Sequence, residues 1–142
     1  MSVDVHVILN RGKLAKPQQW RQAIIDNGFA LELETGYEPE EHEGYLLCTY
    51  RDADSGFEYY FSELEEGMLD DEIMQRIGTR DCVVTLTAHG DTNGLICATI
   101  AAAVLCAISG GLLLDDASEQ LFVEADDAVE YARAQEAALS GG

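Results

Sequence analysis

Histidine and cysteine have the widest chemical range of the residues in this chain, because together they can hold a metal ion or form a nucleophile and base pair. His6, His42 and His89 each stand without a second histidine three to five residues away, and the four cysteines form no CxxC pair. The spacing therefore predicts no metal site, no cofactor and no metal requirement for folding. A spatial pair of Cys48 or Cys82 with His89 stays open, since such partners need only meet in three dimensions.

Acidic residues offer a second kind of chemistry, because two neighbouring carboxyl groups can act as general acid and base. A chain with 27 acidic residues, however, produces adjacent carboxylates as ordinary solvated surface, so we assign the doublets no catalytic role. The doublets are Glu40-Glu41, Asp70-Asp71, Asp115-Asp116 and Asp126-Asp127. Asp52, Asp54 and Glu63 fit three places of a calcium-binding loop, but the sixth place requires glycine and holds Phe57.

Net charge restricts the class of partner. Eight lysines and arginines oppose the 27 acids, which gives a formal charge of −19, and beyond residue 30 only four arginines face 25 acids. Such a surface repels phosphate backbones and anionic lipids, so the sequence argues against nucleic-acid and membrane binding. It favours encounter with a basic protein through electrostatic steering.

Tyrosines lie among the acids in two segments, a mixture typical of protein interfaces. Tyr37 and Tyr45 flank an acidic loop, and Tyr60 is predicted to share a strand face with Glu58. The alternative is a charged surface with ordinary core tyrosines. Under the interface hypothesis, charge reversal within the acidic loop slows association. The predicted partner-binding residues are Tyr37, Glu38, Glu40, Glu41, Glu43, Tyr45, Glu58 and Tyr60.

Hydrophobic periodicity predicts an α+β fold with residues 1–142 in a single domain. Trp20 lies on a helical stripe that begins at Pro17 and ends at Gly28, and an alanine-rich helix and a C-terminal helix capped by Asp126 follow later. We expect these three helices to pack on a mixed or antiparallel sheet of about five to seven strands. The predicted strands are residues 3–9, 29–33, 45–50, 57–61, 81–88, 112–114 and 121–123.

The segment 95–114 has no charged residue, and its length is that of a bilayer span. Its alanines, the Gly110-Gly111 pair and the lack of basic residues at either end favour instead a buried helix from Leu95 to Ser109. The N-terminus has no signal-peptide apolar stretch, which predicts a cytoplasmic protein. Its cysteines are then reduced core residues, namely Cys48, Cys82, Cys97 and Cys106.

Four segments have a familiar order: Ile25 to Phe29 at the end of the Trp-bearing helix, Ser55 to Tyr60, His89 to Asp91, and Gly110 to Asp115 after the alanine-rich helix. In this order the chain resembles small bacterial immunity proteins that neutralise secreted antibacterial toxins, including those delivered by type VI secretion. The resemblance implies a cytoplasmic protein that occludes the active site or substrate surface of a cognate toxin, often a nuclease with a basic cleft.

Three function hypotheses follow, each from a different class. An immunity or inhibitor protein predicts tight, salt-sensitive binding to one basic protein. A small enzyme with a spatially assembled Cys/His or carboxylate site predicts turnover that is lost with one side chain. A structural subunit predicts stable self-assembly, such as a homodimer. Charge and resemblance favour the first.

Overall fold

Residues 2–140 are described by the structure, a computed structural model, and they form an α+β fold around one antiparallel sheet. Its seven strands have the order β2-β3-β4-β5-β1-β6-β7. The strands are β1 (Ser2–Leu9), β2 (Leu31–Leu33), β3 (Glu43–Tyr50), β4 (Ala53–Glu63), β5 (Cys82–His89), β6 (Leu112–Asp115) and β7 (Gln120–Phe122). The helices are α1 (Pro17–Asp26), α2 (Asp71–Met74), α3 (Thr92–Ser109) and α4 (Ala125–Leu139), with a 3-10 turn at Arg11–Lys13.

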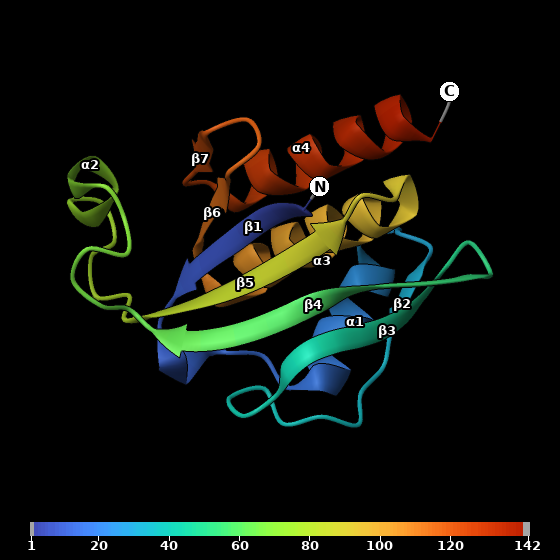
Figure 1. Cartoon of the computed structure of the whole chain (residues 1–142), viewed down its shortest axis with the longest axis horizontal. Helices are drawn as coiled ribbons and strands as arrows, with labels where there is room; N and C mark the ends of the chain where they lie inside the picture. The colour runs from blue at the N-terminus through green and yellow to red at the C-terminus, as the bar shows by residue number, and fades with distance from the viewer. Residues whose placement is uncertain (1, 141–142) are drawn as a thin grey trace.

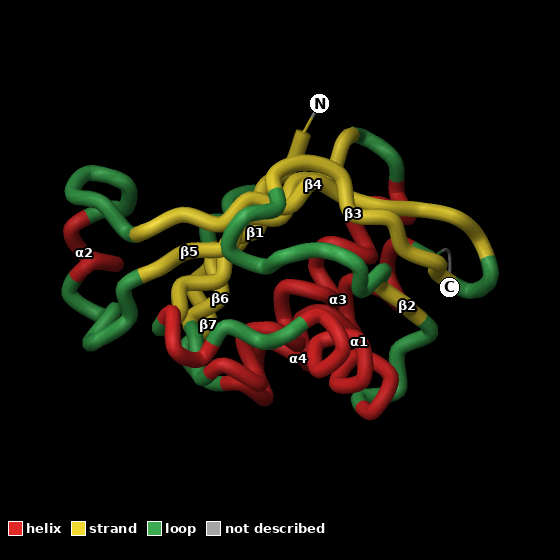
Figure 2. The backbone as a smooth tube through the Cα atoms, turned by 90° about the horizontal axis from the view of Figure 1, so that it is seen from below, coloured by secondary structure: helices red, strands yellow, loops and turns green. Residues whose placement is uncertain are grey.

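The sheet forms one layer, and α1, α3 and α4 form a second layer on one side of it (Figures 1 and 2). Helix α3 is central, because it packs on β1, β4 and β5 and also against α1 and α4. We call the helix-covered side of the sheet the inner face and the opposite side the outer face. The predicted fold class, sheet size and three packing helices are confirmed.

Helix ends follow local sequence signals in most places. Pro17 is the first residue of α1, and Gly28 takes a φ of +86° just beyond its end, a conformation that glycine adopts without a steric cost. The start of α4 corrects one prediction, because Glu124 and not Asp126 is the N-cap residue. Asp126 and Asp127 lie in the first turn instead, where carboxylates are stabilised by the helix dipole.

Helix α3 ends at Ser109 as the sequence predicts, but it begins at Thr92, three residues before the predicted start at Leu95. Asp91 caps it by accepting a hydrogen bond from the amide of Gly94 at 2.9 Å, and Gly110 ends it in the left-handed conformation with a φ of +67°. By length and composition α3 could cross a membrane, but 72% of it is buried inside the fold. It is therefore the central core helix, as the alanine content indicates.

Ala102 on α3 is fully buried, and its small side chain allows the helix to approach its neighbours closely. We expect Ala102→Leu to lower the free energy of unfolding by about 1 to 3 kcal/mol through overpacking. The matched control is Ala134→Leu on the exposed side of α4, which should change stability by less than about 0.5 kcal/mol. Urea denaturation of the three proteins is the measurement, and equal midpoints would contradict the close packing of α3.

The β3–β4 hairpin is tighter than the predicted strands 45–50 and 57–61 imply, since these leave six residues, 51–56, for the turn. Only Arg51 and Asp52 form the turn, with φ of 48° and 66°, and Ala53 already pairs with Tyr50. A two-residue turn with both φ values positive fits the right-handed twist of the flanking strands, and aspartate tolerates that conformation. Gly56 therefore lies within β4 rather than in a loop.

The segment between β4 and β5 folds over one end of the outer face. Ile8, Val83 and Leu112 point outward there and are buried in a second, smaller apolar cluster. They are covered by side chains of the connecting segment, namely Leu64, Leu69, Ile73 and Ile77. Among residues 2–140 no helix packs against the remainder of the outer face (Figures 1 and 2).

Buried phenol and thiol groups make the fold sensitive to alkali. Burial and a 2.6 Å hydrogen bond to Glu136 raise the pKa of Tyr50 to about 12, and burial raises the pKa of Cys106 to about 11. In the unfolded chain these groups ionise near 10.0 and 9.0. The unfolded state therefore loses protons first, and stability should fall as pH rises from about 9 to about 12.

Urea midpoints measured across that pH range test this prediction. Tyr50→Phe should make the decline above pH of about 10 shallower, because the variant lacks one of the groups whose ionisation favours unfolding. A midpoint that stays constant over the whole range would contradict it.

Candidate functional site

The open part of the outer face is the candidate site, because strand pairing brings polar and aromatic side chains from five strands together there. Directly paired residues of neighbouring strands project from the same side of a sheet. One row across the outer face is Tyr45, Glu58, Thr87 and Asp4. The next row is Glu43, Tyr60, Thr85, His6 and Leu114.

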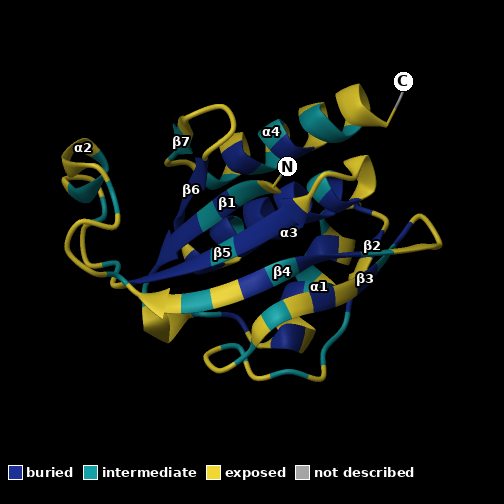
Figure 3. Ribbon diagram, in the orientation of Figure 1, coloured by how far each residue is buried: buried dark blue, intermediate teal, exposed yellow. Residues whose placement is uncertain are grey.

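Strands β3 and β4 carry the most exposed apolar groups of this face. Tyr45 is 53% exposed, Leu47 is 57% exposed and Tyr60 is 37% exposed. Glu43 lies opposite Tyr60, and Glu58 lies opposite Tyr45. We call these five residues the acidic-aromatic patch. Exposed positions recur along β3 and β4, whereas β5 is mostly buried and β1 is exposed only at Ser2 (Figure 3).

The acidic-aromatic patch is held in place by the buried inner side of β4 and by hydrogen bonds among side chains of the outer face. Phe57 and Tyr59, on the inner side of β4, are 1% exposed, so the backbone that carries Glu58 and Tyr60 is anchored in the core. Glu58 accepts one hydrogen bond from the Tyr60 hydroxyl and pairs with His89. The bond to Glu58 raises the pKa of Tyr60 above its ordinary value. These contacts restrict the rotamers of Glu58 and Tyr60.

Gly56 has a specific role beneath the ring of Tyr45. A β-carbon at this position would lie 2.5 Å from the ring and 2.6 Å from the carbonyl oxygen of Leu46. Only glycine therefore leaves room for Tyr45 to lie across β4. The ring of Tyr45 therefore packs against the backbone of β4 at Gly56.

The acidic loop of residues 34–42 adjoins this patch at His42, whose Nε2 lies 3.1 Å from the Tyr45 carbonyl oxygen, but the part of the loop around Tyr37 packs elsewhere. Tyr37 packs its ring 5.6 Å from that of Tyr59, and the Tyr59 hydroxyl donates to the carbonyl of Pro39 at 2.6 Å. Since Tyr59 points to the inner face, the loop borders that side. Burial raises the pKa of Tyr37 well above its usual range, as expected for a ring packed in the fold.

The predicted partner-binding residues thus fall into two groups. Glu43, Tyr45, Glu58 and Tyr60 lie together on the outer face, where the structure adds Leu47, which the sequence argument did not include. Tyr37, Glu38, Glu40 and Glu41 belong to the acidic loop, and Glu40 is occupied by an ion pair with Arg11 at 2.8 Å. The two groups do not form one continuous row of the sheet.

The cysteine and histidine pairs left open by the sequence do not meet. Cys82 and His89 are the first and last residues of β5, so the length of the strand separates them. Cys48 is buried on the inner face, whereas His89 bonds to Glu58 on the outer face. All four cysteines are free and buried, which confirms that they are core residues.

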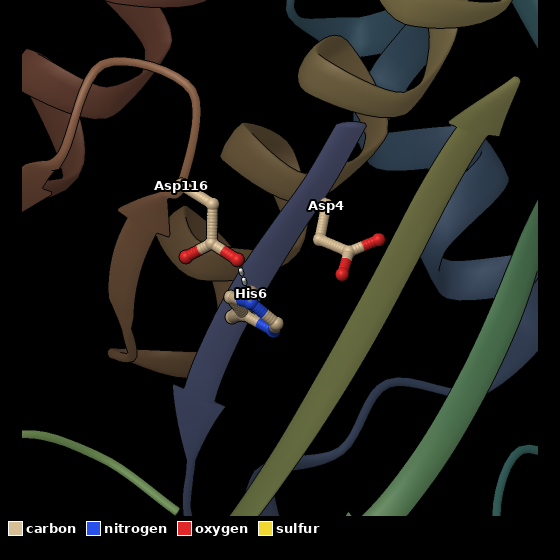
Figure 4. Close-up of side chains that lie close together, drawn as sticks. All are labelled: Asp4, His6 and Asp116. Carbon is tan, nitrogen blue, oxygen red and sulfur yellow. Dashed lines mark hydrogen bonds and ion pairs between the residues drawn. The ribbon is translucent and has the colours of Figure 1, made fainter. Parts of the chain in front are cut away.

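A second polar group on the outer face was missed by the spacing argument. Asp4 and His6 project from β1, and Asp116 follows β6, which pairs with β1 (Figure 4). The Nε2 atom of His6 is 2.8 Å from Asp116 Oδ2, and its Nδ1 atom is 2.9 Å from the Thr85 hydroxyl. We call Asp4, His6 and Asp116 the Asp-His-Asp cluster.

An imidazole between a carboxylate and a hydroxyl has the order of a nucleophilic triad, here Asp116, His6 and Thr85. Acyl transfer also needs hydrogen-bond donors for the oxyanion. Strand β5 pairs with β4 on one side and with β1 on the other. The backbone amides beside Thr85 therefore form the hydrogen bonds of the sheet and do not point to an oxyanion. This geometry does not favour Thr85 as a nucleophile.

The chain matches no protein-family model, no curated protein and no solved structure. The outer face with its acidic-aromatic patch and its Asp-His-Asp cluster therefore carries the functional argument.

Proposed function

We propose that this protein binds a basic protein partner on the outer face of its sheet, and that it is a cytoplasmic immunity protein for a cognate toxin. The observation that carries the proposal is the acidic-aromatic patch. Tyr45, Leu47 and Tyr60 expose apolar surface on the part of the outer face that no helix of the described residues covers, and Glu43 and Glu58 lie between them. Large rings within a charged surface are the usual composition of interface hot spots.

Charge identifies the class of partner. The formal charge of −19 steers basic molecules toward the protein and repels nucleic acid. A toxin that holds a phosphate backbone in a basic cleft would meet a surface that presents carboxylates in place of phosphates. The resemblance to immunity proteins points to the same kind of partner, and occlusion of its active site is the proposed mode of inhibition.

Rigidity favours the outer face over the acidic loop as the contact surface. Side chains that are already ordered lose less entropy on binding. Glu58 and Tyr60 are held by the hydrogen bonds to each other and to His89, on a strand anchored in the core. The loop acids contribute to long-range steering but are not the proposed centre of the contact.

Self-assembly through this face is disfavoured by the same charges. A two-fold interface would place Glu43 and Glu58 of one copy near those of the other. Like charges facing each other across an interface cost several kcal/mol by typical magnitudes. A structural subunit would need a different surface, and the two edge strands of the sheet, β2 and β7, have only three residues each.

Binding kinetics with the product of a neighbouring gene test the proposal. The variant Glu43→Lys with Glu58→Gln alters the outer face, and Glu38→Gln with Glu41→Lys makes the same charge change in the acidic loop. Both should slow association and flatten its salt dependence through the change in net charge. Only the outer-face variant should also speed dissociation, because only its residues are in contact.

Measurement at two salt concentrations separates steering from contact, since salt screens long-range attraction more than a close contact. Equal dissociation rates for wild type and the outer-face variant, with binding intact, would show that the interface lies on another surface. Absence of binding together with turnover of a small molecule would support the enzyme hypothesis instead.

A further inference from the structure

The Asp-His-Asp cluster brings three metal-ligating groups together from distant parts of the chain. Asp4 and His6 are two residues apart on β1 and so share its outer face, and Asp116 lies 110 positions beyond His6. One ligating atom from each of the three lies within 4.8 Å of the other two. Two atoms bound to one ion at about 2.1 Å lie about 3.4 Å apart at a tetrahedral angle and about 4.2 Å apart when they are opposite each other, so a pair 4.8 Å apart must close by about 0.6 to 1.4 Å on binding.

Neighbouring hydroxyl groups orient two of the three side chains. Thr85 lies 2.9 Å from Nδ1 of His6, and Thr87 donates to Oδ1 of Asp4 at 2.7 Å. Such supporting hydrogen bonds fix the orientation of metal-ligating side chains in proteins. They leave Nε2 of His6 and Oδ2 of Asp4 without a bond to these threonines. Both threonines belong to β5, and the pairing of β5 with β1 fixes their positions relative to His6 and Asp4.

We propose that Asp4, His6 and Asp116 bind a divalent transition-metal ion on the outer face. Two carboxylates and one imidazole suit an ion of intermediate hardness, such as Mn²⁺ or Zn²⁺, because imidazole is a weak ligand for Mg²⁺ and Ca²⁺. On binding, Nε2 of His6 and Oδ2 of Asp116 exchange their 2.8 Å contact for bonds to the ion. The strongly negative surface raises the local concentration of cations.

A small pocket adjoins two of the three proposed ligands, His6 and Asp116. A hollow of about 220 Å³ is bordered by His6, Thr85 and Asp116 on the sheet side and by Met68, Leu69 and Ile73 of the segment that folds over the sheet. Three protein ligands leave positions for water or a small oxygen-donor ligand, and this pocket has room for either. The site is accessible from solvent because Asp116 is exposed.

This ion is not needed to build the fold. Strand β1 is held by eight paired positions with β5 and four with β6, so two of the three ligands are in place without it. The expectation that folding requires no metal is therefore compatible with the site. The proposal also stands apart from partner binding, since its residues lie on β1 and directly after β6 and not on β3 and β4.

Binding of Mn²⁺ alone, followed by electron paramagnetic resonance of the free ion, tests the proposal. Mn²⁺ is the probe because it binds thiols weakly, and the four cysteines then add no background. We expect one ion per chain, retained in a large excess of Mg²⁺. Mn²⁺ that is displaced by this Mg²⁺ would show that only diffuse surface charge holds it, and this would overturn the proposal.

Variants locate the site. His6→Ala and Asp4→Asn should each weaken Mn²⁺ binding by at least about 10-fold. His89→Ala removes an imidazole from the same face and should leave the affinity unchanged. Asp4→Asn keeps the shape of the side chain, so it remains informative if His6→Ala folds poorly. Affinities of both cluster variants within about twofold of wild type would overturn the proposal.

Discussion

Replacement of Trp20 by alanine is expected to lower the free energy of unfolding by about 3 to 5 kcal/mol. The indole is 1% exposed and packs at a ring distance of 6.1 Å from Tyr59, between α1 and the sheet. Its Nε1–H donates to the carbonyl of Ala101 at 2.9 Å, which ties α1 to the central helix. The change therefore opens a cavity and removes a buried hydrogen bond at once.

Trp20→Phe is the matched control, because it keeps most of the ring volume and removes the indole N–H. We expect a loss of about 1 to 2 kcal/mol for this variant. Urea denaturation should be followed by circular dichroism, since Trp20 is the single tryptophan and its fluorescence disappears in both variants. Equal losses for the two variants would show that the hydrogen bond and not the packing dominates.

Replacement of Tyr60 by alanine is expected to weaken partner binding by about 2 kcal/mol, which corresponds to about 30-fold in Kd. The ring projects from β4 between Glu43 and Thr85, and its hydroxyl orients Glu58. Loss of a rigid contact acts mainly on the lifetime of a complex, so the dissociation rate should rise while the association rate changes little.

Two further variants separate the contributions of Tyr60. Tyr60→Phe keeps the ring and loses the bond to Glu58, so its effect should be the smaller of the two. Ile25→Ala removes a side chain of similar exposure from α1, on the other side of the molecule, and should leave binding unchanged. A larger effect for Ile25→Ala than for Tyr60→Ala would place the contact on the helices.

The elements of the fold could be predicted because their signals are local. Alternation of Val5 and Val7 with polar residues marks β1, and Gly28 and Gly110 mark helix ends by their positive φ. The exact hairpin was not predictable from Asp52 and Ser55, since both six-residue and two-residue turns accept such residues, and pairing along β3 and β4 decides between them.

The site was predicted only in part, because strand order is not a local property. Glu58 and Tyr60 could be placed on one face by alternation, and β3–β4 pairing adds Glu43 and Tyr45 to it. The position of the acidic loop depends on the contact of Tyr37 with Tyr59, and the spacing of residues in the sequence does not predict this contact. The Asp-His-Asp cluster needs β6 beside β1, an arrangement that brings together residues 110 positions apart.

The most direct test of the central claim is a map of the contact surface by nuclear magnetic resonance. The labelled protein is titrated with the unlabelled product of a neighbouring gene, and amide and side-chain shifts are followed. We expect the largest changes at Tyr45, Leu47 and Tyr60, with little change in α1 and α4. Changes concentrated in those two helices, with the outer face unaffected, would contradict the account.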